Sequence, residues 1–200
     1  MLGVCNHRTM DVKSRIILEE HCPECLRQPT VVPIEKIIDA YGIDIDYQYL
    51  TKNGEKVLGK LICIDGITPY YDIDEKKYLL LEVKANTIFI EARLADDENS
   101  NGRYRFTLAH ELAHWILHRE SIIKQNSEAA FVDEIHNSQM EKQADYFASA
   151  LLMPPVAVKR AFFSLRGNGY SRQDVIGIMA QKFEVSKQAM KIRLDAHNLY

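Results

Sequence analysis

The sequence lacks the features that mark secreted, disulfide-rich and membrane-spanning proteins. Its four cysteines in 200 residues are too few for a disulfide scaffold, and in a reducing compartment they would be thiols or metal ligands. Its apolar runs are all shorter than the roughly 20 residues of a membrane-spanning helix. The N-terminus also lacks the apolar stretch of a signal peptide. We therefore expect a cytoplasmic protein with no membrane partner.

A strong excess of one charge is also missing. The 25 Lys and Arg residues against 28 Asp and Glu residues give a net charge of −3. The chain as a whole therefore has no electrostatic attraction for nucleic acid or an anionic membrane. Hydrophobic residues make up 46% of the 200 positions, which is enough to bury one core. These values predict a compact domain in which any nucleic-acid binding is local.

The apolar pattern predicts both strands and helices. Alternating apolar residues predict strands, and Lys84 to Asn86 is short enough for a hairpin between the last two of them. The strands are expected at 43–49, 57–64, 78–83 and 87–92, and the helices at 34–41, 106–117, 138–153, 172–183 and 186–194. The expected fold class is α+β, with a small antiparallel sheet packed against a helical half.

The helix expected at 106–117 carries the pattern HExxH, formed by His110, Glu111 and His114. Residues at i and i+4 of a helix lie one turn apart, so both imidazoles can bind one cation while Glu111 serves as a base for water. Apolar residues flank the motif on nearly all sides, and burying such polar groups is costly unless something binds them. The motif therefore predicts a catalytic zinc ion.

A catalytic zinc ion needs a third protein ligand and an open fourth position. Glu141 and Asp145 are again spaced i and i+4, on the apolar face of the helix expected at 138–153. We predict that Glu141 binds the metal and that Asp145 accepts the other ring N–H of one histidine, His110. The reverse assignment, with Asp145 as the ligand and Glu141 as a surface acid, is the alternative, and the longer glutamate side chain favours the first.

Four further residues have weaker signals. His118 lies four positions after His114 and is interpreted as a residue at the C-terminal end of the helix, stabilised there by the helix dipole. His136, Tyr146 and Tyr170 are candidates for stabilising an oxyanion. Packing in the core or exposure at the surface is the simpler interpretation for each of the three.

Two strings, RFTLAHELAHWILH at 105–118 and EKQADYFASALLMP at 141–154, together resemble the ImmA/IrrE family of metallopeptidases. The similarity covers about residues 31 to 165. It implies a zincin-like, zinc-dependent cytoplasmic peptidase. Characterised members act on helix-turn-helix repressors of the Cro/CI type and relieve the repression of mobile-element or stress-response genes.

The same resemblance assigns roles to individual residues. His110, His114 and Glu141 match the metal ligands of the family, and Glu111 matches its catalytic base. Many relatives carry Asn where this chain has Asp145. An added acid would hold its partner imidazole more firmly and make the site more negative.

The two ends of the chain carry separate signals. We expect an N-terminal arm at 1–30, a metallopeptidase core at 31–165 and a C-terminal helical segment at 166–200. A structural zinc ion on the arm is one interpretation of its ligand-type residues, and incidental thiols are the other; these residues are Cys5, His7, Cys22 and Cys25.

Residues 159 to 195 carry eight basic and three acidic residues, and the pattern at 172–195 resembles a helix-turn-helix. Direct DNA binding competes here with the interpretation that we favour, a helical pair that covers the core or docks a partner. For the whole chain, two alternatives to the peptidase stay open. One is a non-catalytic zinc-containing regulator that binds a repressor or DNA, and the other is a different metal-dependent hydrolase.

Overall fold

The computed structural model describes residues 7–54, 57–127 and 137–200. Its helices are α1 (His7–His21), α2 (Ile34–Ala40), α3 (Ala92–Asp96), α4 (Asn101–Asn126), α5 (Ser138–Leu152), α6 (Pro155–Gly167), α7 (Arg172–Phe183) and α8 (Lys187–Ala196), with 3₁₀ turns η1 (Pro23–Leu26) and η2 (Glu98–Ser100). Its strands are β1 (Asp44–Gln48), β2 (Gly59–Ile62), β3 (Gly66–Asp72), β4 (Lys77–Val83) and β5 (Thr87–Glu91).

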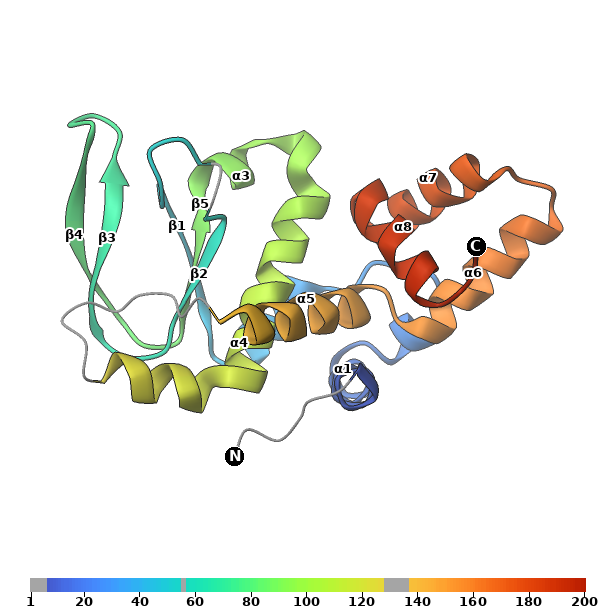
Figure 1. The fold of residues 1–200 in the computed structure, drawn as a ribbon, viewed down its shortest axis with the longest axis horizontal. Helices are drawn as coiled ribbons and strands as arrows, with labels where there is room; N and C mark the ends of the chain where they lie inside the picture. Colours follow the sequence, from blue (N-terminus) through green and yellow to red (C-terminus); the bar gives the residue numbers. More distant parts are fainter. Residues whose placement is uncertain (1–6, 55–56, 128–136) are drawn as a thin grey trace.

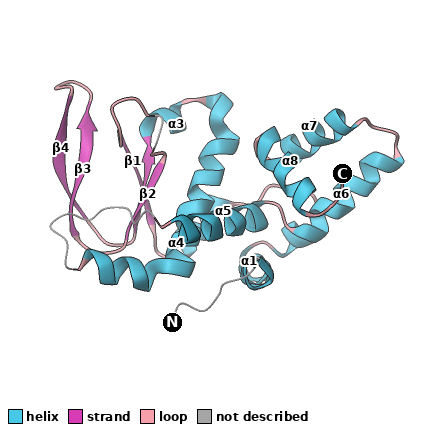
Figure 2. Ribbon diagram, in the orientation of Figure 1, coloured by secondary structure: helices cyan, strands magenta, loops and turns pink. Residues whose placement is uncertain are grey.

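The strands gather at one end of the molecule and α6, α7 and α8 at the other (Figure 1; Figure 2). The predicted α+β class is confirmed. Among the described helices, none is both long and apolar enough to cross a membrane.

Strand β5 forms the centre of a three-stranded sheet with the order β1-β5-β2. It pairs in parallel with β1 and antiparallel with β2, so the sheet is mixed rather than purely antiparallel. All five residues of β5 are buried. The predicted hairpin between β4 and β5 is wrong, because β4 pairs with β3 in a separate two-stranded sheet. Strand β3 was not expected, since Pro69 lies in its middle and proline is depleted within strands.

A single hydrophobic core runs through the helical half. Helix α1, from the segment expected to be an arm, packs against α5 and contributes Met10, Ile17 and Leu18 to this core. Residues of α2, α4, α5, α6, α7 and α8 belong to the same cluster. A second, smaller cluster joins the two sheets; it consists of Leu50, Ile62, Val83 and Phe89. The burial of apolar side chains thus connects the helices from both ends of the chain.

Close backbone contact fixes the two C-terminal helices to the start of α4. A Cβ atom at Gly102 would lie 2.7 Å from the backbone nitrogen of Ser186 and 2.8 Å from the carbonyl carbon of Val185. Next to this contact, Arg105 donates hydrogen bonds to the carbonyl oxygens of Val32, over 2.6 Å, and Glu184, over 3.3 Å. Gly102 is therefore required by the approach of another backbone segment.

We expect Gly102→Ala to lower the free energy of unfolding by about 1–3 kcal/mol, because the turn between α7 and α8 must move to admit the methyl group. Gly177→Ala is the matched control, since its Cβ would meet only the Lys187 side chain, at 4.0 Å. Within helix α7 this second substitution should stabilise the protein by about 0.5–1 kcal/mol. Urea denaturation of both variants measures the difference, and equal midpoints would contradict the contact.

Candidate metal centre

The candidate metal centre lies where α4 packs against α5. The helices carry alanine where they meet, and all four of these alanines have no exposed surface: Ala109 and Ala113 on α4, and Ala144 and Ala148 on α5. Small side chains let two helix backbones approach closely. That approach brings the polar residues of one helix within reach of those of the other.

His110, His114 and Glu141 meet at this contact. The Nε2 atom of His110 lies 3.2 Å from Oε2 of Glu141, and Nε2 of His114 lies 3.4 Å from Oε1 of the same carboxylate. The two Nε2 atoms are 3.0 Å apart. The three ligand-type atoms all lie within 4.8 Å of one another. Two imidazole nitrogens and a carboxylate oxygen form a donor set that zinc accepts, so these residues fit the ion.

Asp145 holds the other side of His110. Its Oδ1 atom lies 2.9 Å from Nδ1 of His110, so the ring donates Nδ1–H to Asp145 and turns Nε2 toward Glu141. Glu141, and not Asp145, faces the Nε2 atoms of both histidines. The geometry therefore corresponds to the first of the two assignments made from the sequence. Side-chain exposure of 40% at Glu141 leaves this side of the centre open to solvent.

The same contacts change the protonation of the metal-free residues. Burial lowers the pKa of His110, but the hydrogen bonds with Asp145 and Glu141 outweigh burial and raise it to about 10. The pKa of Glu141 is held well below its usual range, chiefly by the hydrogen bond with His110. Without a metal ion, His110 is therefore protonated at neutral pH.

Glu111 is buried where α4 packs against β2. A Cβ atom at Gly59 of β2 would lie 2.6 Å from the Cγ2 atom of Thr107 and 2.8 Å from Oε1 of Glu111. Only glycine leaves room for the Glu111 carboxyl group in this position. Gly59 is a residue that motif analysis does not identify, although an isolated glycine within a strand often marks such an approach.

His118 differs from its predicted place. Helix α4 continues for two further turns, to Asn126, because Ile122 continues the buried face, so His118 lies well inside the helix and is 3% exposed. Its Nδ1 atom lies 3.2 Å from Nδ1 of His114, and its Nε2 atom lies 2.9 Å from Oε1 of Gln143. Burial lowers the pKa of His118. The i+4 spacing was visible in the sequence, but the partner on α5 was not.

The oxyanion candidates that the structure describes, Tyr146 and Tyr170, make their hydrogen bonds away from His110 and His114. Tyr146 donates its hydroxyl to Asp11 of α1 over 3.1 Å and stacks on His7. Tyr170 lies between α6 and α7, where its carbonyl oxygen accepts a hydrogen bond from Arg166. His136 lies outside the described residues.

The predicted ligands of a second, structural zinc ion do not converge. His7 is the first residue of α1 and Cys22 directly follows its last residue, so a rise of 1.5 Å per residue separates them by roughly 22 Å. Cys22 and Cys25 form a disulfide, contrary to the expectation of thiols, and a disulfide provides no thiolate for a metal. Cys5 lies outside the described residues.

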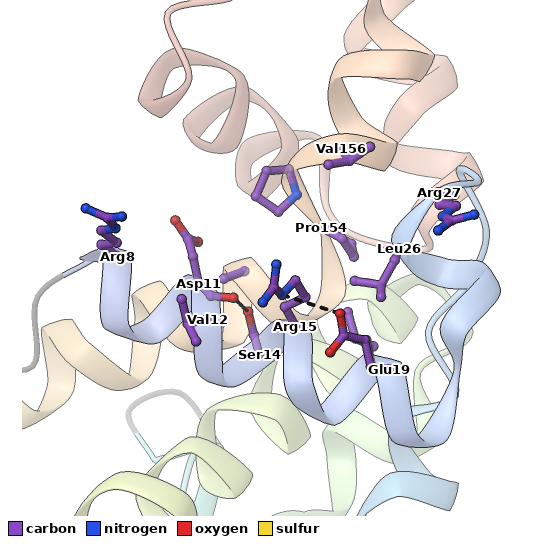
Figure 3. Close-up of a pocket in the computed structure, with 13 residues that line it drawn as sticks. Arg8, Asp11, Val12, Ser14, Arg15, Glu19, Leu26, Arg27, Pro154 and Val156 are labelled. Atoms are coloured by element: carbon purple, nitrogen blue, oxygen red, sulfur yellow. Dashed lines mark hydrogen bonds and ion pairs between the residues drawn. The ribbon is translucent and has the colours of Figure 1, made fainter.

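A cavity of about 370 Å³ lies elsewhere, between α1 and the start of α6 (Figure 3). Its apolar side is formed by Leu18, Leu26, Pro154 and Val156, and Arg8 and Arg27 lie at its edge. The residues that line it include none of the predicted metal ligands. The metal centre is therefore separate from this cavity.

Comparison with known proteins agrees with the motifs. The family model Peptidase_M78, described as the IrrE N-terminal-like domain, matches residues 71–195. The chain belongs to this family. The match contains both motif helices, α4 and α5. It begins at residue 71, later than the expected start at residue 31, and it extends through α7 into α8, past the expected end at residue 165. The resemblance to the ImmA/IrrE family is confirmed, and with it the zincin-like α+β fold.

A solved structure shares the fold of this family member. It is titled "Mycobacterium tuberculosis transcriptional regulator" and matches with a TM-score of 0.51 at 15% sequence identity. The match covers 94% of this chain but 46% of the other, so this chain spans about half the length of that protein. No curated protein matches the sequence.

We expect zinc binding to strengthen as pH rises. Because the pKa of metal-free His110 is raised to about 10, the ion must displace a proton at any pH below that value. The apparent affinity should therefore rise about tenfold per pH unit between about pH 7 and 9, with about one proton released per ion. Calorimetry in two buffers of different protonation enthalpy measures this release.

Asp145→Asn is the control for this prediction, because it removes a charge that holds the proton on His110. Its pH dependence should level off at a lower pH than that of the unmodified protein. An affinity that does not change with pH in either protein would show that His110 is neutral before the metal binds.

Proposed function

We propose that this protein is a zinc-dependent peptidase in which His110, His114 and Glu141 hold one zinc ion and Glu111 is the general base. The observation that carries the proposal is the convergence of two Nε2 atoms and one carboxylate from neighbouring helices, within 4.8 Å of one another. Membership of a peptidase family supports it independently. Zinc bound there would supply Lewis acidity, which polarises a carbonyl group and lowers the pKa of a coordinated water molecule.

Residues of the protein around the proposed zinc ion have separate roles in catalysis. Glu111 follows His110 directly on α4, and Gly59 confines its carboxyl group. In this role it takes a proton from the attacking water and returns it to the leaving amine. Asp145 holds the ring of His110 through Nδ1, so the imidazole keeps its orientation while substrate and solvent exchange. The partly exposed side of the centre at Glu141 is where a peptide would enter.

For the substrate we propose a transcriptional repressor of the helix-turn-helix, Cro/CI type, whose cleavage relieves repression of mobile-element or stress-response genes. Support comes from the family, which implies a protein substrate. The fold is also shared with a protein titled as a transcriptional regulator. The family match supports the type of reaction, whereas the similarity to the solved structure supports the fold alone.

The alternative is a non-catalytic zinc-containing regulator that binds a repressor or DNA through 172–195. Helices α7 and α8 do form two capped helices around a tight turn, with Ser186 accepting a hydrogen bond from the backbone nitrogen of Ala189. However, Arg193 is 1% exposed, and Arg172 lies 3.2 Å from Asp195. The guanidinium groups of Arg193 and Arg172 therefore already have partners within the protein. These contacts favour a pair of helices that covers the core over a surface that binds phosphate groups.

We expect Glu111→Gln to bind one zinc ion per chain and to lose cleavage, because the amide cannot accept the proton. His114→Ala should lose both zinc and cleavage, because it removes a ligand. Each variant is co-expressed with whichever helix-turn-helix repressor is encoded beside its gene. Immunoblots of the repressor and metal analysis of the purified chain are the measurements. A Glu111→Gln chain that relieves repression while the repressor stays intact would support the regulator instead.

Gly59→Ala should lower the cleavage rate by up to about 100-fold while zinc content is unchanged, because the new methyl group displaces the Glu111 carboxyl group and not the ligands. Gly167→Ala is the matched control, since a Cβ there meets no atom within 4 Å. Rates at saturating substrate separate this effect from binding. Equal rates for Gly59→Ala and Gly167→Ala would exclude a role for the β2 contact.

A further inference from the structure

A line of hydrogen bonds leads from His114 across to α5, away from the site of the metal ion. The Nδ1 atom of His114 lies 3.2 Å from Nδ1 of His118, and Nε2 of His118 lies 2.9 Å from Oε1 of Gln143. His114 and His118 are 8% and 3% exposed, so the line runs through the protein interior. A buried polar side chain needs its hydrogen-bond partners, which makes the direction of each bond in this line meaningful.

The positions of the protons follow from the chemistry of the three groups. The amide oxygen of Gln143 can only accept, so His118 donates Nε2–H to it. The Nδ1 atom of a neutral His118 is then an acceptor, and His114 must donate Nδ1–H to it. The Nε2 atom of His114 is left without a proton, so in the metal-free protein it can accept a hydrogen bond from Nε2–H of His110, 3.0 Å away.

The opposite orientation of the Gln143 amide would reverse every bond. Its NH₂ group would donate to Nε2 of His118, and His118 would donate Nδ1–H to His114. His114 would then carry its proton on Nε2, where it blocks the metal. Only the orientation with Oε1 toward His118 is compatible with His114 as a ligand.

We propose that Gln143, acting through His118, sets the tautomer and ring orientation of the zinc ligand His114. This inference rests on the proposed function, since it concerns a ligand of the same site. Gln143 and His118 are positioning residues, because they act through His114 and do not reach the metal. The amide oxygen of Gln143 on α5 thus determines, through two hydrogen bonds, that Nε2 of His114 on α4 carries no proton.

The two zinc ligands of α4 are then held in different ways. His110 donates to a carboxylate, Asp145, whose side chain is 61% exposed. His114 donates to a neutral relay that is largely buried. A charged partner on both ligands would add a further negative charge to a site that already contains Glu111 and Glu141. The neutral relay orients His114 without that charge.

The test compares three variants of the full chain with the unmodified protein. Gln143→Met keeps the length of the side chain and removes the amide acceptor, and His118→Phe removes the intermediate ring. Gln139→Met is the matched control, because Gln139 lies exposed in the first turn of α5. Zinc affinity is measured by competition with a chromophoric chelator. Ring protons are assigned by two-bond ¹H–¹⁵N correlation of ¹⁵N-histidine in the zinc-loaded unmodified protein.

We expect about tenfold weaker zinc binding for Gln143→Met and for His118→Phe, and unchanged binding for Gln139→Met. In the spectrum of the unmodified protein, His118 should carry its proton on Nε2 and His114 on Nδ1. A proton on Nδ1 of His118 overturns the proposal, whatever the affinities, because packing alone does not select a tautomer. So does zinc binding by Gln143→Met as tight as that of the control.

The same measurements separate this proposal from the proposed function. Failure of the unmodified protein to bind zinc would overturn both. Stoichiometric zinc binding that is insensitive to Gln143→Met and His118→Phe would overturn the relay alone, and the assignment of His110, His114 and Glu141 would stand.

Discussion

The metal centre depends on how closely α4 and α5 approach each other. Fully buried alanines on both helices permit the contact, and one carboxylate, that of Glu141, then reaches the Nε2 atoms of both His110 and His114. Burying the two imidazoles would be costly if each stood alone, and the partly exposed Glu141 is the partner that they share. Together the three side chains form a set of ligands for one divalent cation. Binding of that cation would offset the unfavourable free energy of burying the imidazoles.

Most of this centre could be predicted from the sequence because its information is local. HExxH and the pair formed by Glu141 and Asp145 lie within single helices, where a spacing of four residues fixes which side chains share a face. The pairing of the two helices is not local information, but a catalytic zinc ion needs a third protein ligand, and the two acids on the apolar face of the second helix provided the candidates. Glu141 could therefore be matched with His110 and His114 although 27 positions separate it from the second histidine.

The parts that escaped prediction depend on contacts between distant segments. Gln143 has no spacing relation to His118, and Gly59 has none to Glu111, so only the packing of α4 against α5 and β2 reveals them. Helix α6 was not among the expected helices, because two successive prolines, Pro154 and Pro155, are typical of a helix end. Pro155 instead occupies the first position of α6, where the missing N–H has no helical partner to lose.

The parallel pairing of β1 with β5 has a consequence for how the protein folds. Asp44 lies opposite Thr87, and β2, β3 and β4 all intervene in the chain, so the central strand is the last of the five to leave the ribosome. Pairing of strands so far apart in the chain requires closing a long loop, and the entropy cost of that closure comes before any stabilising contact forms. The sheet therefore folds more slowly than the helices. Helix α4 follows β5 after the short α3 and η2 and packs on it. We therefore expect the carboxyl group of Glu111, which lies against Gly59 of β2, to reach its final position only after the sheet has closed.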